Sequence, residues 1–262
     1  MNTLAHLTLL FAAAILCACI VLLPGCSKND SGPVEPGPVI VPEYINTPYG
    51  IFPTGKTESV GGFLAAINER IGTINNVRVI GLFFGASSQQ YIYAGTMLVN
   101  NNPVDTFTSF GSVVYSRPNS HISAPLDNVL FDGSYHHWRI GGSDSVAAFT
   151  DSVVSPDGSV IITAPAEDDG VRKDTEFTVQ WTPTTTDSVL VTITDPNGKI
   201  AYAITTGDQV TFPKATLGTL ASGASRVDVI RYKYHIAPAG TRNVLLLALS
   251  TDQRDITLYI PE

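Results

Sequence analysis

Apolar and polar residues alternate in short runs over most of this 262-residue chain, and Gly, Pro, Asn and Asp interrupt the runs. A period of two indicates strands that bury one face, and turn residues at intervals of about 8–12 residues are typical of β-sandwiches and barrels. The pattern predicts an all-β fold, with strands over residues 77–84, 91–99, 111–115, 128–131, 135–140, 146–154, 160–163, 177–181, 189–194, 200–204, 227–234, 244–249 and 256–260.

Two stretches could be helical. Residues 60–71 could form a helix of three turns, but Gly61, Gly62 and the Val-rich run that follows favour a strand equally. Residues 214–220 are expected to form one or two helical turns after Pro213. Among the turns, Asp132-Gly133 lies between two predicted strands, and Asp-Gly in that setting is a strong hairpin signal. The chain from 135 to 140 is therefore expected to be the return strand of a hairpin.

The N-terminus carries a different pattern, an apolar run of about 17 residues, which is less than the ~20 that span a bilayer. The run ends in Leu23-Pro24-Gly25-Cys26 and a Pro-rich segment follows. This arrangement resembles the lipobox of bacterial lipoproteins. The resemblance implies a signal peptide over residues 1–25, a lipidated Cys26 at the head of a Pro-rich tether over 26–43, and a lipid anchor in the membrane. Ser27 favours the outer membrane. An uncleaved transmembrane anchor is the alternative, since the first six residues lack Lys and Arg.

The second half of the chain contains "TEFTVQWTP" followed by "DSVLVTITDPNGK". These segments resemble the second and third strands of fibronectin type III and immunoglobulin-like domains. The resemblance implies that Trp181 fills the core, with Phe177 and Val179 on the same face. It weakens downstream, where Arg226 stands in place of a tyrosine and the apolar phase breaks, which suggests a bulge near residues 229–230.

We therefore expect two β-sandwich-like domains, over residues 44–156 and 157–262. The layout of lipobox, tether and two β-modules resembles uncharacterised envelope lipoproteins of Bacteroidota-like bacteria.

The run "FDGSYHHWRIGGS" contains the most chemically suggestive side chains. On a strand, Tyr135, His137 and Arg139 share one face, while His136 and Trp138 share the other with Ile140. The apolar set indicates the core side, so the two histidines cannot ligate one ion together, and His136 is expected to be neutral and hydrogen-bonded near the core edge. The outer strip of Tyr135, His137 and Arg139 is a candidate surface for binding a sugar or a protein.

Enzyme signatures are lacking, and we predict no catalytic residue, no metal site and no cofactor. Cys17, Cys19 and Cys26 all precede the folded part, which excludes thiol chemistry there. A glycan hydrolase with two carboxylates on separate strands stays possible. With a net charge of −8 and 15% charged residues, the chain offers no basic cluster for nucleic acid.

The triplet Asp-Ser-Val occurs three times, with its serines at Ser145, Ser152 and Ser188. It resembles the sequon for periplasmic O-glycosylation in Bacteroidota. The alternative is that Asp-Ser ends a turn and Val opens a strand. Taken together, the sequence predicts a lipid-anchored envelope protein with a non-catalytic binding or structural role and an envelope glycan or protein as its partner. The rival interpretations are a carbohydrate-binding lipoprotein of a polysaccharide uptake system and a hydrolase.

Overall fold

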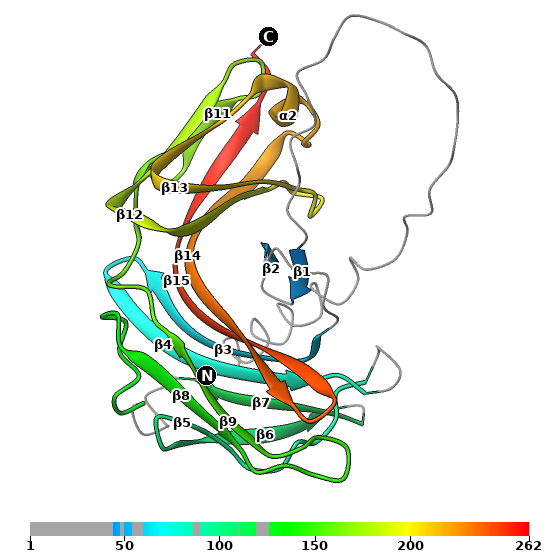
Figure 1. Ribbon diagram of the computed structural model, residues 1–262. Coiled ribbons are helices and arrows are strands. Elements are labelled where there is room, and N and C mark those ends of the chain that lie inside the picture. Colours follow the sequence, from blue (N-terminus) through cyan, green and yellow to red (C-terminus); the bar gives the residue numbers. More distant parts are fainter. Residues whose placement is uncertain are drawn as a thin grey trace, which may run out of the picture. The chain divides into compact units, whose positions relative to one another are not determined.

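The computed structural model describes residues 44–47, 50–53, 60–85, 90–109, 111–118 and 126–261 (Figure 1). The chain divides into two units, over residues 1–57 and 58–262. In the first unit, β1 (Tyr44–Thr47) pairs antiparallel with β2 (Gly50–Pro53). The predicted signal peptide, Cys26 and the tether lie outside the described residues. Within the described residues, no helix combines the length and the apolar character needed to cross a membrane.

The second unit is built from one hydrogen-bonded array of 13 strands. The path runs β10-β12-β14-β15-β3-β4-β7-β6-β5-β8-β9, while β11 pairs with β15 and β13 with β12. The all-β prediction is thus confirmed, and the only helix within the described residues of this unit is α2 (Lys214–Gly218), where one was expected. The strands are β3 (Val60–Ile71), β4 (Ile74–Phe83), β5 (Met97–Val99), β6 (Asn102–Ser109), β7 (Ser112–Pro118), β8 (Tyr135–Ile140), β9 (Phe149–Val154), β10 (Ile161–Ala164), β11 (Asp169–Arg172), β12 (Phe177–Thr194), β13 (Ile200–Phe212), β14 (Gly223–Ala239) and β15 (Arg242–Tyr259).

Strand β3 settles the ambiguity of residues 60–71. It lies between β4, which runs antiparallel to it, and β15, which runs parallel. Phe63 and Ala65 on one face and Leu64 and Ala66 on the other are all 1% exposed or less. A strand buried on both faces loses its alternation, which explains why the sequence pattern could not distinguish it from a helix.

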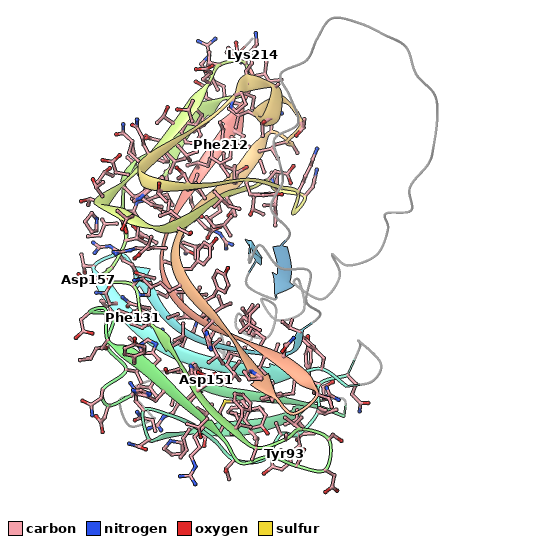
Figure 2. The ribbon with its side chains drawn as sticks, viewed as in Figure 1. Tyr93, Phe131, Asp151, Asp157, Phe212 and Lys214 are labelled. Atoms are coloured by element: carbon pink, nitrogen blue, oxygen red, sulfur yellow. The ribbon has the colours of Figure 1, made fainter. Side chains whose placement is uncertain are left out.

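The array folds over two hydrophobic cores. In the first core, β3, β4 and β15 pack against the layer of β5, β8 and β9. Strand β6 connects the two layers, because its first residues pair with β5 and its later ones with β7. His235 Nε2 on β14 lies at hydrogen-bond distance, 3.1 Å, from Oδ2 of Asp151 on the edge strand β9, and Figure 2 labels Asp151. The largest side chains of this core are Phe83, Met97, Tyr115, Trp138 and Ile140.

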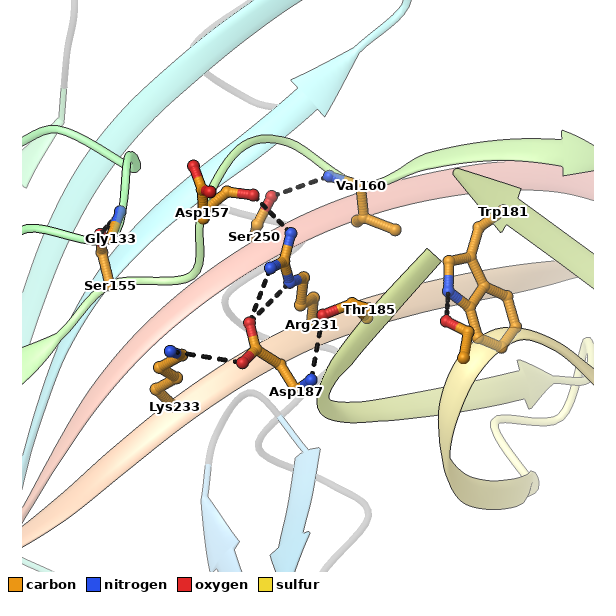
Figure 3. Close-up of polar contacts among 11 residues, drawn as sticks. Gly133, Ser155, Asp157, Val160, Trp181, Thr185, Asp187, Arg231, Lys233 and Ser250 are labelled. Carbon is orange, nitrogen blue, oxygen red and sulfur yellow. Dashed lines mark hydrogen bonds and ion pairs between the residues drawn. The ribbon is translucent and has the colours of Figure 1, made fainter. Parts of the chain in front are cut away.

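The second core lies among β10 to β15 and contains Trp181, which is 3% exposed. Its indole Nε1 donates a hydrogen bond of 3.0 Å to the carbonyl of Gly207 (Figure 3). Val179 and Phe177 pack into the same cluster. The predicted core position of Trp181 is therefore confirmed. The two strands predicted around it, 177–181 and 189–194, are parts of the single strand β12.

The predicted bulge at residues 229–230 is wrong. Strand β14 pairs with β15 in one unbroken register from Gly223 to Ala239, and its pairing with β12 is also regular. Val229 points into the second core, and Ile230, on the opposite face, is also buried. The change of apolar phase reflects burial of both faces of β14 and needs no extra residue.

Strands β14 and β15 contribute to both cores. Ala237 and Leu246 belong to the first core, and Val227 and Ile256 to the second. The expected domain boundary at residues 156 and 157 separates most other members of the two cores. By the contacts of its backbone, however, the chain from residue 58 to residue 262 forms one unit. The division into domains at that point stays a prediction.

A buried ion pair lies where β12 approaches β14. Arg231 Nη2 is 2.7 Å from Asp187 Oδ2, and the side chains are 8% and 14% exposed. Lys233 Nζ lies 3.3 Å from the other carboxylate oxygen. Arg231 also donates a hydrogen bond to the carbonyl of Asp157, in the segment before β10 (Figure 3). This group connects β12 and β14 to the chain between β9 and β10.

Candidate binding site on strand β8

Strand β8 presents alternating buried and exposed side chains, as the sequence predicts. Trp138 and His136 are fully buried. Tyr135, His137 and Arg139 are exposed, and Tyr135 is 56% exposed. Strand β9 pairs with β8 along its whole length, and β5 pairs with it on the other side from Trp138 to Ile140. The three outward side chains therefore project from a strand that is paired on one edge throughout and on both edges at Arg139.

The turn between β5 and β6 fixes the end of this strip. Asn100 and Asn101 have φ values of 43° and 65°, a left-handed pair that Asn tolerates better than most residues. Asn100 Oδ1 accepts a hydrogen bond of 2.7 Å from the backbone N–H of His137. Its Nδ2 donates to the carbonyls of Asn128 and Tyr135. One amide side chain thus binds three backbone groups in two segments, Asn128 and the start of β8.

The outward face of β8 forms part of an open depression of about 770 Å³. The rings of Tyr135 and His137 are stacked, with centroids 5.9 Å apart and planes at 26°. Leu98 on β5 and Thr150 on β9 lie directly opposite Arg139 in the two ladders and share its face. The residues that line the depression are Leu98, Asn100, Asn101, Asn128, Leu130, Ser134, Tyr135, His137, Trp138, Arg139 and Thr150.

Arg139 is the only residue with a permanent charge among those lining residues, and none of them is Asp or Glu. Within the described part of the chain, no ion pair involves Arg139, whereas Arg231 and Arg172 each hold a carboxylate at 2.8 Å or less. An exposed guanidinium in a depression that also contains two rings and several neutral polar groups can contact an anionic or hydroxyl-rich ligand.

On the inner face, His136 has a structural role. Its Nε2 lies 2.7 Å from the carbonyl of Leu130, and its ring meets that of Phe131 edge-on with centroids 5.0 Å apart. Burial lowers the pKa of His136 below its ordinary value, against an opposing effect of the bond to Leu130. The ring is therefore neutral near pH 7, as predicted, and His136 and His137 point to opposite sides of the sheet.

The predicted hairpin around Asp132-Gly133 is wrong. Residues 128–131 form no strand, and the partners of β8 are β9 along its whole length and β5 from Trp138 to Ile140. Gly133 does adopt a left-handed φ of 82°, and Asp132 forms an isolated bridge with Asp157. The segment before β8 is held by side chains instead, since His136 and Asn100 bind its carbonyls.

The serines of the Asp-Ser-Val triplets lie in three different settings. Ser145 is exposed in the loop before β9, Ser152 is half-buried within β9, and Ser188 is half-buried within β12. Ser188 hydrogen-bonds the hydroxyl of Tyr232. Ser152 lies opposite His137 in the β8–β9 ladder, on the face of the strip. The suggested turn-to-strand role does not describe the last two triplets, which lie inside strands, and glycosylation of these serines stays a prediction.

Other candidate sites are outside the described residues or were not expected from the sequence. Cys26, the predicted lipidation site, lies outside them. In the described ranges, no group of three His, Cys, Asp or Glu residues could hold a metal ion. Asn100 and Leu130 were missed by sequence reasoning. The contacts of Asn100 with β8 join residues 35 and 37 positions apart, whereas Leu130 acts through its backbone carbonyl, which the identity of its side chain does not indicate. The run of three asparagines at 100–102 was the one visible signal.

No protein-family model matches the chain, and no curated protein is significantly similar to it. Among solved structures, the fibronectin(III)-like modules of Clostridium thermocellum CbhA share 10% identity over 75% of this chain and 89% of theirs, with a TM-score of 0.23. The IG1 and IG2 domains of DIP-gamma share 13% identity over 84% and 98%, with a TM-score of 0.21. A 1.5-MDa bacterial ice-binding adhesin shares 14% identity over 79% and 67%, with a TM-score of 0.23.

These structures include the fibronectin III and immunoglobulin-like classes that the segment around Trp181 resembles. Their identities and TM-scores are too low to carry an argument about function. The all-β, sandwich-like description of this protein rests on its own strands and cores.

Proposed function

We propose that this chain is a lipid-anchored protein of the bacterial cell envelope that binds an envelope glycan or protein through the outward face of β8, without catalysis. The observation that carries the binding role is the strip of Tyr135, His137 and Arg139, which is exposed on a paired strand and lines an open depression. The Leu-Pro-Gly-Cys run before the Pro-rich segment supports the anchor. Acyl chains on Cys26 would hold the protein at the outer membrane surface.

The anchor is tested by substituting Cys26→Ser and labelling cells with radioactive palmitate. The wild-type protein should incorporate label and sediment with membranes. The variant should incorporate none, because it lacks the thiol that is alkylated. Equal labelling of the two proteins would contradict lipidation at Cys26.

The binding role is tested by pull-down of envelope fragments with wild-type protein and with the Tyr135→Ala, Arg139→Ala double variant. The double variant should lose binding while its melting temperature stays close to that of the wild type, because both side chains are exposed. A matched control is Tyr259→Ala with Lys214→Ala, another exposed tyrosine and cation. Equal loss of binding in the two double variants would argue against a site on β8.

A carbohydrate-binding lipoprotein of a polysaccharide uptake system is the more specific form of this function. The rings of Tyr135 and His137 and the polar groups around them favour it over a protein scaffold role. A hydrolase would need two facing carboxylates. The lining of the depression contains neither Asp nor Glu. Release of reducing sugar from a polysaccharide by the wild-type protein would overturn the non-catalytic proposal.

O-glycosylation is a separate part of the proposal. Ser145 is the most accessible of the three candidate serines, whereas Ser188 already bonds Tyr232. The intact mass from the native host should exceed the lipidated mass by whole glycan units, and Ser145→Ala should remove one unit. If none of Ser145→Ala, Ser152→Ala and Ser188→Ala loses the mass of a glycan unit, none of the three serines is glycosylated.

A further inference from the structure

We propose that the depression on β8 binds acidic saccharides and that Arg139 receives their carboxylate group. This inference rests on the proposed binding function and assigns a ligand class to it. It is drawn from the charge of the depression, from the groups that surround Arg139, and from the form of the surface.

The first argument concerns how the chain uses its cations. The chain has a net charge of −8, and acidic residues outnumber Lys and Arg by 23 to 15. Several arginines pair with these acids, as Arg78 does with Glu69 and Arg226 with Asp228. Arg139 has no carboxylate partner among the described residues, although it lies on a strand held on both sides. A guanidinium in this position keeps its planar fork available for an external carboxylate.

The second argument concerns the sign of the charge in the depression. The residues that line the depression include Arg139 and no acid, so the local charge is opposite to that of the whole chain. An anionic ligand is attracted to this one surface and is disfavoured over most of the remaining acidic surface. A single arginine is too little for nucleic acid, whose affinity depends on many phosphate contacts.

The third argument favours a saccharide over an acidic protein segment. The depression that contains Arg139 is also lined by Thr150, by Asn101 and by Tyr135 and His137, whose rings are stacked. Hydroxyl and amide groups match sugar hydroxyls, and ring faces match the C–H face of a pyranose. Protein hot spots instead fill well-packed, desolvated pockets. The depression here is open, which suits a chain of sugar units lying across it.

The experiment measures binding of the full chain, in detergent, to polygalacturonate and to the same polymer after its carboxyl groups have been reduced to alcohols. The acidic polymer should bind, and the reduced polymer should bind at least about tenfold more weakly, because a charge-assisted hydrogen bond is lost. Arg139→Gln should weaken binding of polygalacturonate by about tenfold or more, whereas Arg139→Lys should weaken it less. Lys214→Gln is the control for a general loss of positive charge and should bind as the wild type does.

The outcomes separate the ligand class from the function. Equal binding of the acidic and reduced polymers, with binding still lost in Tyr135→Ala, would overturn the acidic class and keep the binding function. Binding of poly-glutamate as tight as that of polygalacturonate would assign the site to acidic protein instead. Failure of the protein to bind either polymer or any envelope fragment would overturn both proposals. Unchanged melting temperatures in the Arg139 variants would show that a loss of binding is not a loss of folding.

Discussion

Trp138→Ala removes the largest of the fully buried side chains in the described chain, and this substitution tests the two faces of β8 most directly. The indole packs in the first core with Met97 and Ile140. Its Nε1 is buried without a hydrogen-bond partner. Removing the ring therefore opens a cavity and also removes an unsatisfied donor, and these two effects have opposite signs.

Truncation of a buried Trp to Ala costs about 3–5 kcal/mol, and a buried unsatisfied donor costs about 1–3 kcal/mol while it is present. Because loss of the unsatisfied donor offsets part of the cost of the cavity, we expect a value near the lower end of the first range, about 3 kcal/mol. For a unit of this size, each kcal/mol lowers the melting temperature by about 2–4 °C, which gives a shift of about 6–12 °C. Trp138→Phe keeps most of the packing and removes the donor, so its shift should be much smaller.

The assay is thermal unfolding followed by near-ultraviolet circular dichroism, with the Tyr135→Ala, Arg139→Ala variant beside the two Trp138 variants. The outer pair should shift the transition by less than about 4 °C, because two exposed substitutions at about 0.5 kcal/mol or less each cost about 1 kcal/mol or less together. A larger shift from the outer pair than from Trp138→Ala would show that the faces of β8 are assigned the wrong way round. A Trp138→Phe variant as unstable as Trp138→Ala would refute the argument about the unsatisfied donor.

Three further predictions concern buried polar groups. Tyr115→Phe should cost about 1–3 kcal/mol in urea denaturation, since the Tyr115 hydroxyl, whose pKa burial raises to about 12, bridges the N–H of Ala94 and the carbonyl of Gly95. Asp187→Ala should cost about 3–5 kcal/mol because it leaves the guanidinium of Arg231 buried without this carboxylate. Adding Arg231→Met should restore much of that loss, and a double variant whose loss equals the sum of the two single losses would contradict this coupling. His136 has a lowered pKa in the folded state, so the unfolded state binds this proton first as the pH falls below about 6.5, and the free energy of unfolding should fall there. Between about pH 7.5 and pH 5, the urea midpoint of His136→Gln should decline less than that of the wild type, and an equal decline would assign the effect to other groups.

The sequence was most informative where one strand buries one face. The alternation of Tyr135 to Ile140 and the core position of Trp181 follow from a period of two, and both are confirmed. The pattern of apolar residues was ambiguous for β3, because that strand is buried on both faces. Strand β14 is also buried on both faces, and its pattern therefore suggested a bulge that the regular register does not contain.

Pairing partners were the harder problem, because they depend on contacts distant in sequence. Asp132-Gly133 has the chemistry of a hairpin turn, yet β8 takes its partners from β5 and β9. The contacts of Asn100 depend on the same long-range pairing, as its side chain reaches the backbone of His137. The strip itself was predicted, and the depression that surrounds it was not, because its lining comes from four separate stretches of chain.

The pairing of β3 with β15 also determines how the molecule responds to force. The two strands run parallel, from Val60 opposite Asn243 to Glu69 opposite Thr251. A pull between the start of β3 and the end of β15 acts along the strands in opposite directions, so the bonds of this ladder are sheared together. A pull between Gly223 and Leu258, which lie opposite each other at one end of the antiparallel β14–β15 ladder, would separate that ladder one pair at a time. Bonds that are sheared together resist more force than bonds that break one pair at a time, so the first geometry should withstand the greater force.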